Sequence, residues 1–255
     1  MGVVLTDAVV RDLAAFGPFF AVDTHTTDSL PHEPWHVMSE LVNDSDVLMQ
    51  RVLAVRAGLA AIAGQVPGAV ELRVAASVAH LGLVARLVSP ALAVAVTSGV
   101  LLEVALPSTR WQRVLGGAFP LSLDAGTDAS DCDMNLESTP ERLACLLASR
   151  VLDGSVRDLV EVTMSLSVSR HVLWGNVASA VNSAASMIAT CKPTWADRSL
   201  TIASLLLGQP PLRGTSAGPA GRDFRRRSCC LIYRAAPDAA GAVCGDCVLS
   251  RHPYP

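Results

Sequence analysis

Four of the seven cysteines lie within the last 27 residues, as an adjacent pair, Cys229 and Cys230, and a second pair, Cys244 and Cys247. Four thiolates in so short a segment can hold an iron–sulfur cluster or a structural zinc, because soft sulfur donors select these centres over hard cations. Zinc sites usually take each pair of ligands from residues about two to four apart. Adjacent cysteines point their side chains in divergent directions, which favours a two-iron cluster. Zinc and disulfides are the alternatives.

The beginning of the chain and its apolar runs bear on the compartment. Asp7, Arg11 and Asp12 lie where a secretory signal would need an unbroken apolar stretch. The apolar run at residues 87–102 carries no charge, but it is interrupted by Pro90 and is shorter than the roughly 20 residues of a spanning helix. We therefore expect a cytoplasmic protein without a membrane span. In that reducing compartment, clustered cysteines are ligands more often than disulfides.

The residues around the cysteines resemble a known family. Residues 226–234, followed by the C-G-D-C segment at 244–247, are similar to the C-terminal signature of FhuF-type ferric-siderophore reductases. In that family a CC-x10-C-x2-C segment holds a [2Fe-2S] cluster. Residues 173–179, Leu-Trp-Gly-Asn-Val-Ala-Ser, look like the tryptophan–glycine–asparagine helix of the same family. Here 13 residues, 231–243, separate the cysteine pairs, three more than the usual spacing. We expect this difference to change the shape of the loop and not the ligands.

The resemblance implies a cofactor, a reaction and partners. Cys229, Cys230, Cys244 and Cys247 would ligate a [2Fe-2S] cluster. The protein would be a cytoplasmic ferric-siderophore reductase that passes one electron to siderophore-bound Fe³⁺ and releases Fe²⁺. Its partners would be a ferric siderophore, most naturally of the hydroxamate type, and an external electron donor such as a ferredoxin, a flavodoxin or a flavin reductase. The alternatives are a non-catalytic iron–sulfur sensor of redox or iron status and a zinc-stapled siderophore-binding protein.

The motifs of self-contained redox and hydrolytic enzymes do not occur in the sequence. It has no G-x-G-x-x-G after a strand, no P-loop and no G-x-S-x-G. A nicotinamide or flavin enzyme with its own electron supply is therefore not expected, and electrons must reach a cluster from elsewhere.

Arginines accompany the cysteines. Residues 209–255 hold seven arginines and three aspartates, a balance of +4, against −3 for the whole chain. A [2Fe-2S] centre with four thiolates is anionic, so nearby arginines favour its reduced state and raise its potential. Nucleic-acid binding is not expected, because this segment offers only Phe224 and Tyr233 for base stacking. We expect substrate or partner contacts from Trp174, Asn176, Arg225, Arg226, Arg227 and Arg234.

The composition and the patterning predict an α+β fold. The chain has 255 residues, 51% hydrophobic and 17% charged, enough to bury a substantial core. We expect a predominantly helical body at 1–207 with a small β-hairpin or sheet region, a Pro/Gly linker at 208–222, and an irregular iron–sulfur segment at 223–255. One helix is predicted to begin at Pro34. Further helices are predicted at 46–64, 71–88, 139–153, 155–190 (with a bend near Trp174) and 194–207. The predicted strands are 100–104 and 119–123.

Three further patterns receive ordinary interpretations. His32 to His36 spell H-E-x-x-H, but Pro34 interrupts the continuous helix that a zinc-protease site needs. The acidic run from Asp131 to Asn135 lacks the glycine and the glutamate of a calcium loop, so it reads as a solvated loop. Cys145 lies among leucines and is expected in the core.

Overall fold

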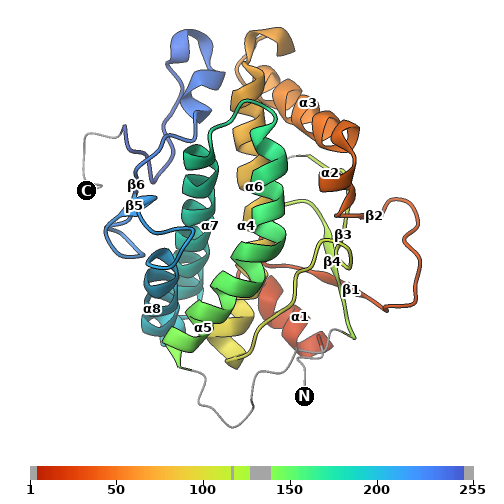
Figure 1. The fold of residues 1–255 in the computed structure, drawn as a ribbon, viewed down its shortest axis with the longest axis vertical. Coiled ribbons are helices and arrows are strands. Elements are labelled where there is room, and N and C mark those ends of the chain that lie inside the picture. Colours follow the sequence, from red (N-terminus) through yellow and green to blue (C-terminus); the bar gives the residue numbers. More distant parts are fainter. Residues whose placement is uncertain (1–4, 116–117, 127–138, 250–255) are drawn as a thin grey trace.

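The computed structural model describes residues 5–115, 118–126 and 139–249. Helices surround a long central helix, with a small sheet on one side and the C-terminal segment beside the ends of two helices (Figure 1). The helices are α1 (Asp7–Ala14), α2 (Glu40–Asn43), α3 (Ser45–Ile62), α4 (Leu72–Ser98), α5 (Pro140–Leu146), a π-helix (Leu147–Val156), α6 (Arg157–Met164), α7 (Arg170–Cys191) and α8 (Ala196–Leu207), with short 3-10 turns at Pro67–Ala69, Pro193–Trp195, Ile232–Ala235 and Pro237–Ala239. The strands are β1 (Asp23–His25), β2 (His36–Val37), β3 (Arg110–Trp111), β4 (Leu121–Asp124), β5 (Ser216–Ala217) and β6 (Arg225–Arg226). The predominantly helical α+β fold is confirmed.

Helix α4 forms the centre of the core and packs against α3 and α7. It continues through Pro90 to Ser98, so the prediction that Pro90 ends it was wrong. A proline inside a helix costs about 3 kcal/mol. Residues on both sides of Pro90 are almost completely buried, and each buried aliphatic side chain contributes about 1.5–3 kcal/mol. Tertiary burial therefore outweighs the local cost of the proline.

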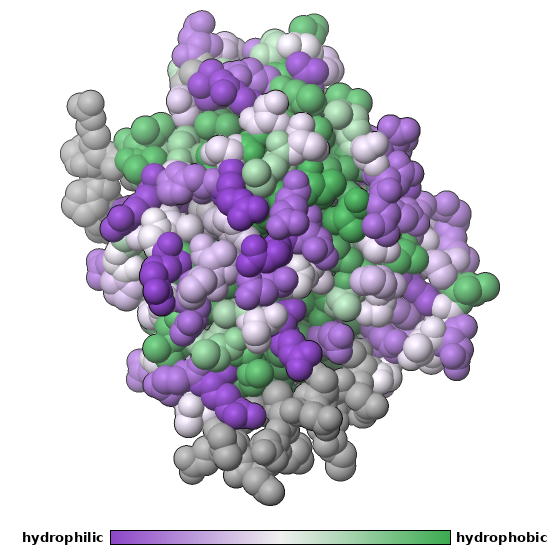
Figure 2. Space-filling model, in the orientation of Figure 1, coloured by the Kyte–Doolittle hydropathy of each residue, from purple (hydrophilic) through white to green (hydrophobic). Residues whose placement is uncertain are grey.

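The same helix is long and apolar enough to cross a membrane, judged by length and composition alone. In the folded chain, 78% of its most apolar window is buried, as in the core helix of a soluble protein. On the face of the molecule shown in Figure 2, hydrophilic side chains are distributed among smaller hydrophobic patches.

The larger sheet has the strand order β1-β4-β3-β2, with β1 and β4 parallel and the other neighbours antiparallel. The predicted strand at 119–123 corresponds to β4, whereas 100–104 form no strand. The helix predicted from Pro34 was also wrong, because His36 and Val37 pair with β3 and a helix begins only at Glu40. The amide of Met38 also donates to the carbonyl of Thr109 at 2.8 Å. Pairing with a distant strand has overridden the local helical periodicity.

One further boundary and the burial of one cysteine differ from the sequence prediction. The break between α6 and α7 lies at residues 165–169, not at Trp174, and Ser169 caps α7 by accepting from the amide of Val172. Cys145, expected in the core, is exposed. The reason is its place on α5, where the neighbouring Leu143 and Ala144 face the core instead.

Strand β5 lies within the predicted linker, 208–222, and pairs with β6 in the cysteine segment, with Ser216 opposite Arg226. Leu212 and Phe224, on either side of this pairing, are completely buried and belong to the main core. The division into a body, a linker and an iron–sulfur segment stays a prediction.

A buried arginine of α4 holds the N-terminal turn in place. Arg86 is 1% exposed. Its guanidinium donates to the carbonyls of Pro18, Phe19 and Ala21 at 3.1, 2.6 and 2.8 Å, and its Nε donates to that of Phe119 at 2.9 Å. Burial lowers the pKa of Arg86 to about 10, so the side chain stays charged at neutral pH. The segment from Pro18 to Ala21 is thus fixed against α4.

Replacing Arg86 with methionine should lower the free energy of unfolding by about 3 kcal/mol or more, because one buried and three partly buried carbonyls lose a charged donor. Urea unfolding followed by circular dichroism measures this loss. Arg73→Met is the matched control on the same helix: Arg73 is exposed and pairs with Glu71, so its loss should cost less than about 1 kcal/mol. Equal losses in the two variants would contradict the role given to Arg86.

Candidate iron–sulfur site

The spacer between the two cysteine pairs folds into a closed excursion. Leu231 has a left-handed conformation, with φ of 70°, and two 3-10 turns follow. The amide of Gly241 then donates to the carbonyl of Tyr233 at 3.0 Å. A Cβ on Gly241 would lie 2.6 Å from that oxygen, so only glycine fits. The spacer therefore leads away from the first cysteine pair after Cys230 and brings the chain back to it at Cys244.

The spacer is anchored to the helical body at one end of α3 and α4. Arg234 donates through Nε to a carboxylate oxygen of Glu71 at 2.9 Å. Gln65 donates to the carbonyl of Ala235 at 2.9 Å, and Ala235 packs into a small apolar cluster with Val70. These contacts accommodate the three additional residues without separating the two cysteine pairs.

The two inner cysteines of the motif, Cys230 and Cys244, contact one another. The thiol of Cys244 donates a hydrogen bond to the sulfur of Cys230, which lowers the pKa of Cys230 to about 6 and raises that of Cys244. Cys230 is buried, and Cys244 is partly exposed. One sulfur from each pair therefore already lies against the other.

The two outer cysteines of the motif, Cys229 and Cys247, accept backbone hydrogen bonds. The sulfur of Cys229 accepts from the amide of Leu231, and that of Cys247 from the amide of Leu249, both at 3.3 Å. Burial raises the pKa of the Cys229 thiol, and the neighbouring sulfurs of Cys230 and Cys247 raise it further. Backbone N–H groups aimed at sulfur stabilise thiolates, and they are a recognised way to set the potential of an iron–sulfur centre. The four cysteine sulfurs are thus close enough to influence one another electrostatically.

The guanidinium of Arg226 lies at the centre of the site. It is 2% exposed and donates through Nη2 to Oδ1 of Asn176 at 2.7 Å and to the carbonyl of Val172 at 3.2 Å. Its positive charge acts to lower the pKa of Cys230, after the larger effect of the hydrogen bond from Cys244. Among the described residues, its Nε and Nη1 atoms have no hydrogen-bond partner. A buried cation with open donors, whose charge acts on the thiols of Cys229, Cys230 and Cys244, fits an anionic group bound there.

Asn176 connects this cation to helix α4. Its amide nitrogen donates to the carbonyl of Ser77 at 2.9 Å, and the Ser77 hydroxyl donates to the carbonyl of Cys230 at 2.9 Å. His80 lies within 3.5 Å of the same amide nitrogen. Burial, aided by the charge of Arg226, lowers the pKa of His80 to about 3 and keeps it neutral. Helices α4 and α7 therefore both contribute polar side chains to the surface on which the cysteine segment packs.

Gly175 allows this segment to approach α7. A Cβ at this position would lie 2.1 Å from the Ser228 hydroxyl and 3.0 Å from Nη2 of Arg226. The glycine of the Trp-Gly-Asn sequence is thus a contact surface for the residues just before Cys229. Trp174 is placed differently: it is 4% exposed, in the core, with the guanidinium of Arg157 5.8 Å from its ring centre.

The other arginines near the cysteines have other surroundings. Arg225 donates to the carbonyls of Arg222 and Phe224 at 3.2 and 2.7 Å. The side chain of Arg227 is exposed, and Arg234 pairs with Glu71 on the helical body. Of the five arginines at positions 222, 225, 226, 227 and 234, Arg226 is the one whose side chain is buried beside the sulfurs.

A groove of about 750 Å³ borders the second cysteine pair. Its walls are α4, α7 and the N-terminal turn that Arg86 holds, and one end is formed by Arg226, Cys244, Gly245 and Asp246. The carboxyl of Asp246 faces Asn182 at 3.4 Å, and burial raises its pKa. A small ligand in this groove would lie against the C-G-D-C segment.

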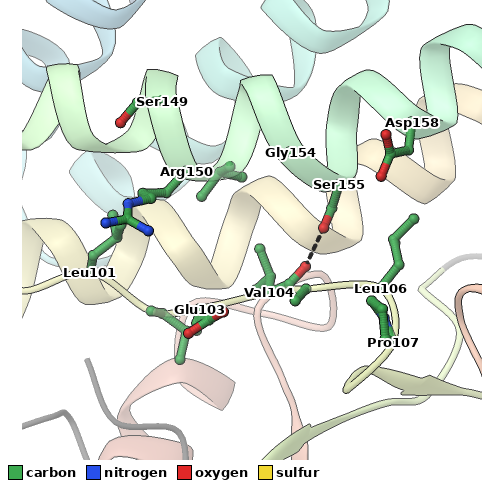
Figure 3. Close-up of a pocket in the computed structure, with 13 residues that line it drawn as sticks. Leu101, Glu103, Val104, Leu106, Pro107, Ser149, Arg150, Gly154, Ser155 and Asp158 are labelled. Carbon is green, nitrogen blue, oxygen red and sulfur yellow. Dashed lines mark hydrogen bonds between the residues drawn. The ribbon is translucent and has the colours of Figure 1, made fainter. Parts of the chain in front are cut away.

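A smaller pocket of about 290 Å³ lies on another side of the molecule (Figure 3). It runs between the extended residues 101–107 and the π-helix, where Gly154 departs from helical geometry. The Ser155 hydroxyl donates across it to the carbonyl of Val104 at 2.8 Å. None of its lining residues belongs to the cysteine segment, so it is separate from this site.

The remaining sequence patterns do not add ligands in the part of the chain that the structure describes. His32 lies in a loop and His36 in β2, so the helix required by H-E-x-x-H is not formed. The run from Asp131 to Asn135, with Cys132, lies outside the described residues. In the described ranges, no three His, Cys, Asp or Glu side chains converge as a single metal ion would require. A two-iron centre shares its four ligands between two metal atoms.

The sequence alone gave no role to Ser77 and His80. A weak signal existed: they are polar residues three apart, about one helical turn, in a mostly apolar helix. Their connection with Asn176 and Cys230 depends on the packing of α4 against α7, which periodicity does not specify.

Changing Gly175 to alanine should displace the cysteine segment and lower the iron and sulfide content, because the new methyl group would overlap the Ser228 hydroxyl. Gly82→Ala is the matched control, since a Cβ there meets no atom within 4 Å. Iron and sulfide analysis of purified protein measures the effect. Adding Ser228→Gly to Gly175→Ala should restore part of the content, and full content in Gly175→Ala alone would contradict this packing.

Comparison with known families agrees with this geometry. Residues 226–249 match the family model of the FhuF 2Fe-2S C-terminal domain. No curated protein matches the chain. The cysteines at 229, 230, 244 and 247 fit the motif of that domain, and the open donors of Arg226 suit an anionic cluster. The C-terminal segment of this chain is therefore an FhuF-type 2Fe-2S domain, whose cofactor is a [2Fe-2S] cluster.

Proposed function

We propose that this protein is a cytoplasmic ferric-siderophore reductase. The observation that carries the proposal is the position of Cys244, which belongs to the 2Fe-2S domain and also lines a groove large enough for a small ligand. Ligand pockets commonly measure about 300–1,000 Å³. A ferric complex in the groove would lie beside the cysteines, with no polypeptide segment between them.

Each group has a chemical role in the proposal. Cys229, Cys230, Cys244 and Cys247 hold the [2Fe-2S] cluster, which supplies a one-electron carrier with a potential that the protein can tune. Siderophores present hard oxygen donors, which hold Fe³⁺ tightly and Fe²⁺ poorly. One electron from an external donor protein, of the ferredoxin, flavodoxin or flavin-reductase class, reduces the bound Fe³⁺ to Fe²⁺. The donor is oxidised by one electron, and the weakly held Fe²⁺ leaves.

The residues near the cysteines divide the remaining tasks. Arg226 places a positive charge beside the sulfurs, and Asn176 orients its guanidinium. Arg225, in strand β6, and Arg227, directly after it, reach the surface and offer contacts to an acidic donor protein or an anionic ferric complex. Arg234 anchors the spacer through Glu71, and Trp174 supports α7 from the core.

Anaerobic release of Fe²⁺ from a ferric trihydroxamate, with a chemical reductant as the electron source, tests the function. The wild-type protein should be coloured by sulfide-to-iron absorption and should release iron catalytically. Cys247→Ser should lose most iron, sulfide and turnover while keeping its helical circular dichroism, because most of the core lies outside the segment. Cys145→Ser, an exposed cysteine outside both the motif and the groove, should behave as wild type.

Two results would identify the alternatives. A coloured protein that accepts electrons but releases no Fe²⁺ would be a redox or iron sensor. Colourless protein with stoichiometric zinc, whose helicity falls when the zinc is removed, would be a siderophore-binding protein with a structural metal.

Neutralising Arg226 should lower the midpoint potential of the cluster. At an effective dielectric constant of about 20, a unit charge roughly 5–8 Å away shifts a one-electron potential by on the order of 100 mV. We expect Arg226→Gln to show this decrease, Arg226→Lys to retain most of the wild-type potential, and Arg227→Gln, at an exposed position, to change it little. Redox titration followed by electron paramagnetic resonance gives the values. Equal shifts for positions 226 and 227 would show that burial of Arg226 has no special effect.

A further inference from the structure

We propose that the groove beside Cys244 binds an amphiphilic ferric siderophore, whose apolar chain lies along α4 and α7 and whose iron-binding head lies at Gly245. This inference rests on the proposed reductase function and names the class of its substrate. A purely hydrophilic chelate would bind this groove less tightly.

The walls of the groove are apolar over most of their length. The N-terminal turn contributes Phe16, Phe19 and Phe20, helix α4 contributes Leu81, and helix α7 contributes Met187. Met187 is 47% exposed, at the surface, whereas Phe16 and Phe20 are buried. Placing hydrophilic groups against such walls removes them from water without a hydrogen-bond partner, which is unfavourable. Placing methylene groups or aryl rings there is favourable.

Charge is confined to one end of the groove. The charged residues that line it are Arg226 and Asp246, and both lie beside Cys244 and Gly245. The oxygen donors of an iron-binding head match this end, and an apolar chain matches the remainder. The polarity of the groove thus orients the ligand, with its iron toward the cysteines.

The groove is already formed in the folded chain. Arg86 fixes the turn that carries the phenylalanines through three carbonyls, those of Pro18, Phe19 and Ala21. Gly82 provides width on the opposite wall, because no atom lies within 4 Å of where its Cβ would be. Little ordering of the protein is therefore needed on binding, and preorganisation of this kind favours affinity.

Gly82 also provides a direct test. Leucine in its place would project into the groove, while the change from glycine favours the helix. Gly58 of α3 is the matched control: it is another helical glycine whose Cβ would meet no atom within 4 Å, and it does not line the groove.

The probes are gallium(III) complexes of a linear trihydroxamate and of the same trihydroxamate carrying a dodecanoyl chain. Gallium(III) has the charge of Fe³⁺ but is not reduced, so binding is measured without electron transfer. Isothermal titration calorimetry on the cluster-loaded protein should show the acylated complex binding at least about tenfold more tightly, because burial of methylene groups is favourable. Gly82→Leu should reduce that advantage about tenfold or more, and Gly58→Leu should leave it unchanged.

Two results would overturn the inference. Equal affinity for the two complexes would do so, as would unchanged binding of the acylated complex by Gly82→Leu. If neither complex binds, and light scattering shows that Gly82→Leu converts a dimer into a monomer, the groove is an interface between copies of the chain, which also overturns it.

The reductase function fails separately. If the acylated complex binds in the groove but its Fe³⁺ form releases no Fe²⁺ under reducing conditions, the binding site stands and the reductase does not. If Fe²⁺ is released from both ferric complexes, and Gly82→Leu changes neither rate, the reductase stands and the assignment of its substrate to the groove is wrong.

Discussion

The buried hydrogen bond between Arg226 and Asn176 is the interaction on which the arrangement of the site depends. A guanidinium that is 2% exposed must have its charge compensated. The 2.7 Å bond to Asn176 fixes one side of it, and its charge lies close enough to Cys230 to lower the pKa of that thiol. The same asparagine binds Ser77, whose hydroxyl holds the carbonyl of Cys230. One side chain of α7 thus positions the cation, the first cysteine pair and helix α4 relative to one another.

This arrangement explains why an irregular segment can hold its shape. Residues after β6 have little regular secondary structure of their own, and short segments of this kind rarely supply enough burial to stay ordered alone. Here the segment is held by contacts on both sides: Gly175 admits Ser228 against α7, and Glu71 and Gln65 hold the spacer at the end of α3 and α4. The helical body therefore serves as the support for the cysteines. It also forms the groove that ends at Cys244, so support and ligand site share the same two helices.

Several local predictions failed where a distant contact opposed a local preference. Pro90 is a strong stop signal in isolation, yet α4 continues because its neighbours on both sides are buried. His36 and Val37 follow a helical pattern but extend to pair with Arg110 and Trp111. The five arginines near the cysteines formed one group in the sequence. Strand pairing alternates the side chains, so Arg226 points inward while Arg225 and Arg227 do not. Periodicity and propensity describe a few turns of chain, and in each case burial elsewhere in the molecule decided the outcome.

The sequence by itself determined the helical α+β class, the C-terminal 2Fe-2S domain and its cofactor. Cysteine chemistry is carried by residue types and spacings, which survive without knowledge of the fold. It also marked Asn176 and Arg226 as residues of interest. Only the tertiary structure decided what those two residues do, since their contact joins positions 50 apart in the chain. Likewise, Ser77 contacts the cysteine segment, and Gly82 and the phenylalanine turn line a groove with it, only after α4, α7 and Arg86 are packed. Such contacts arise from burial of apolar surface, which is non-directional and leaves no short-range pattern in the sequence.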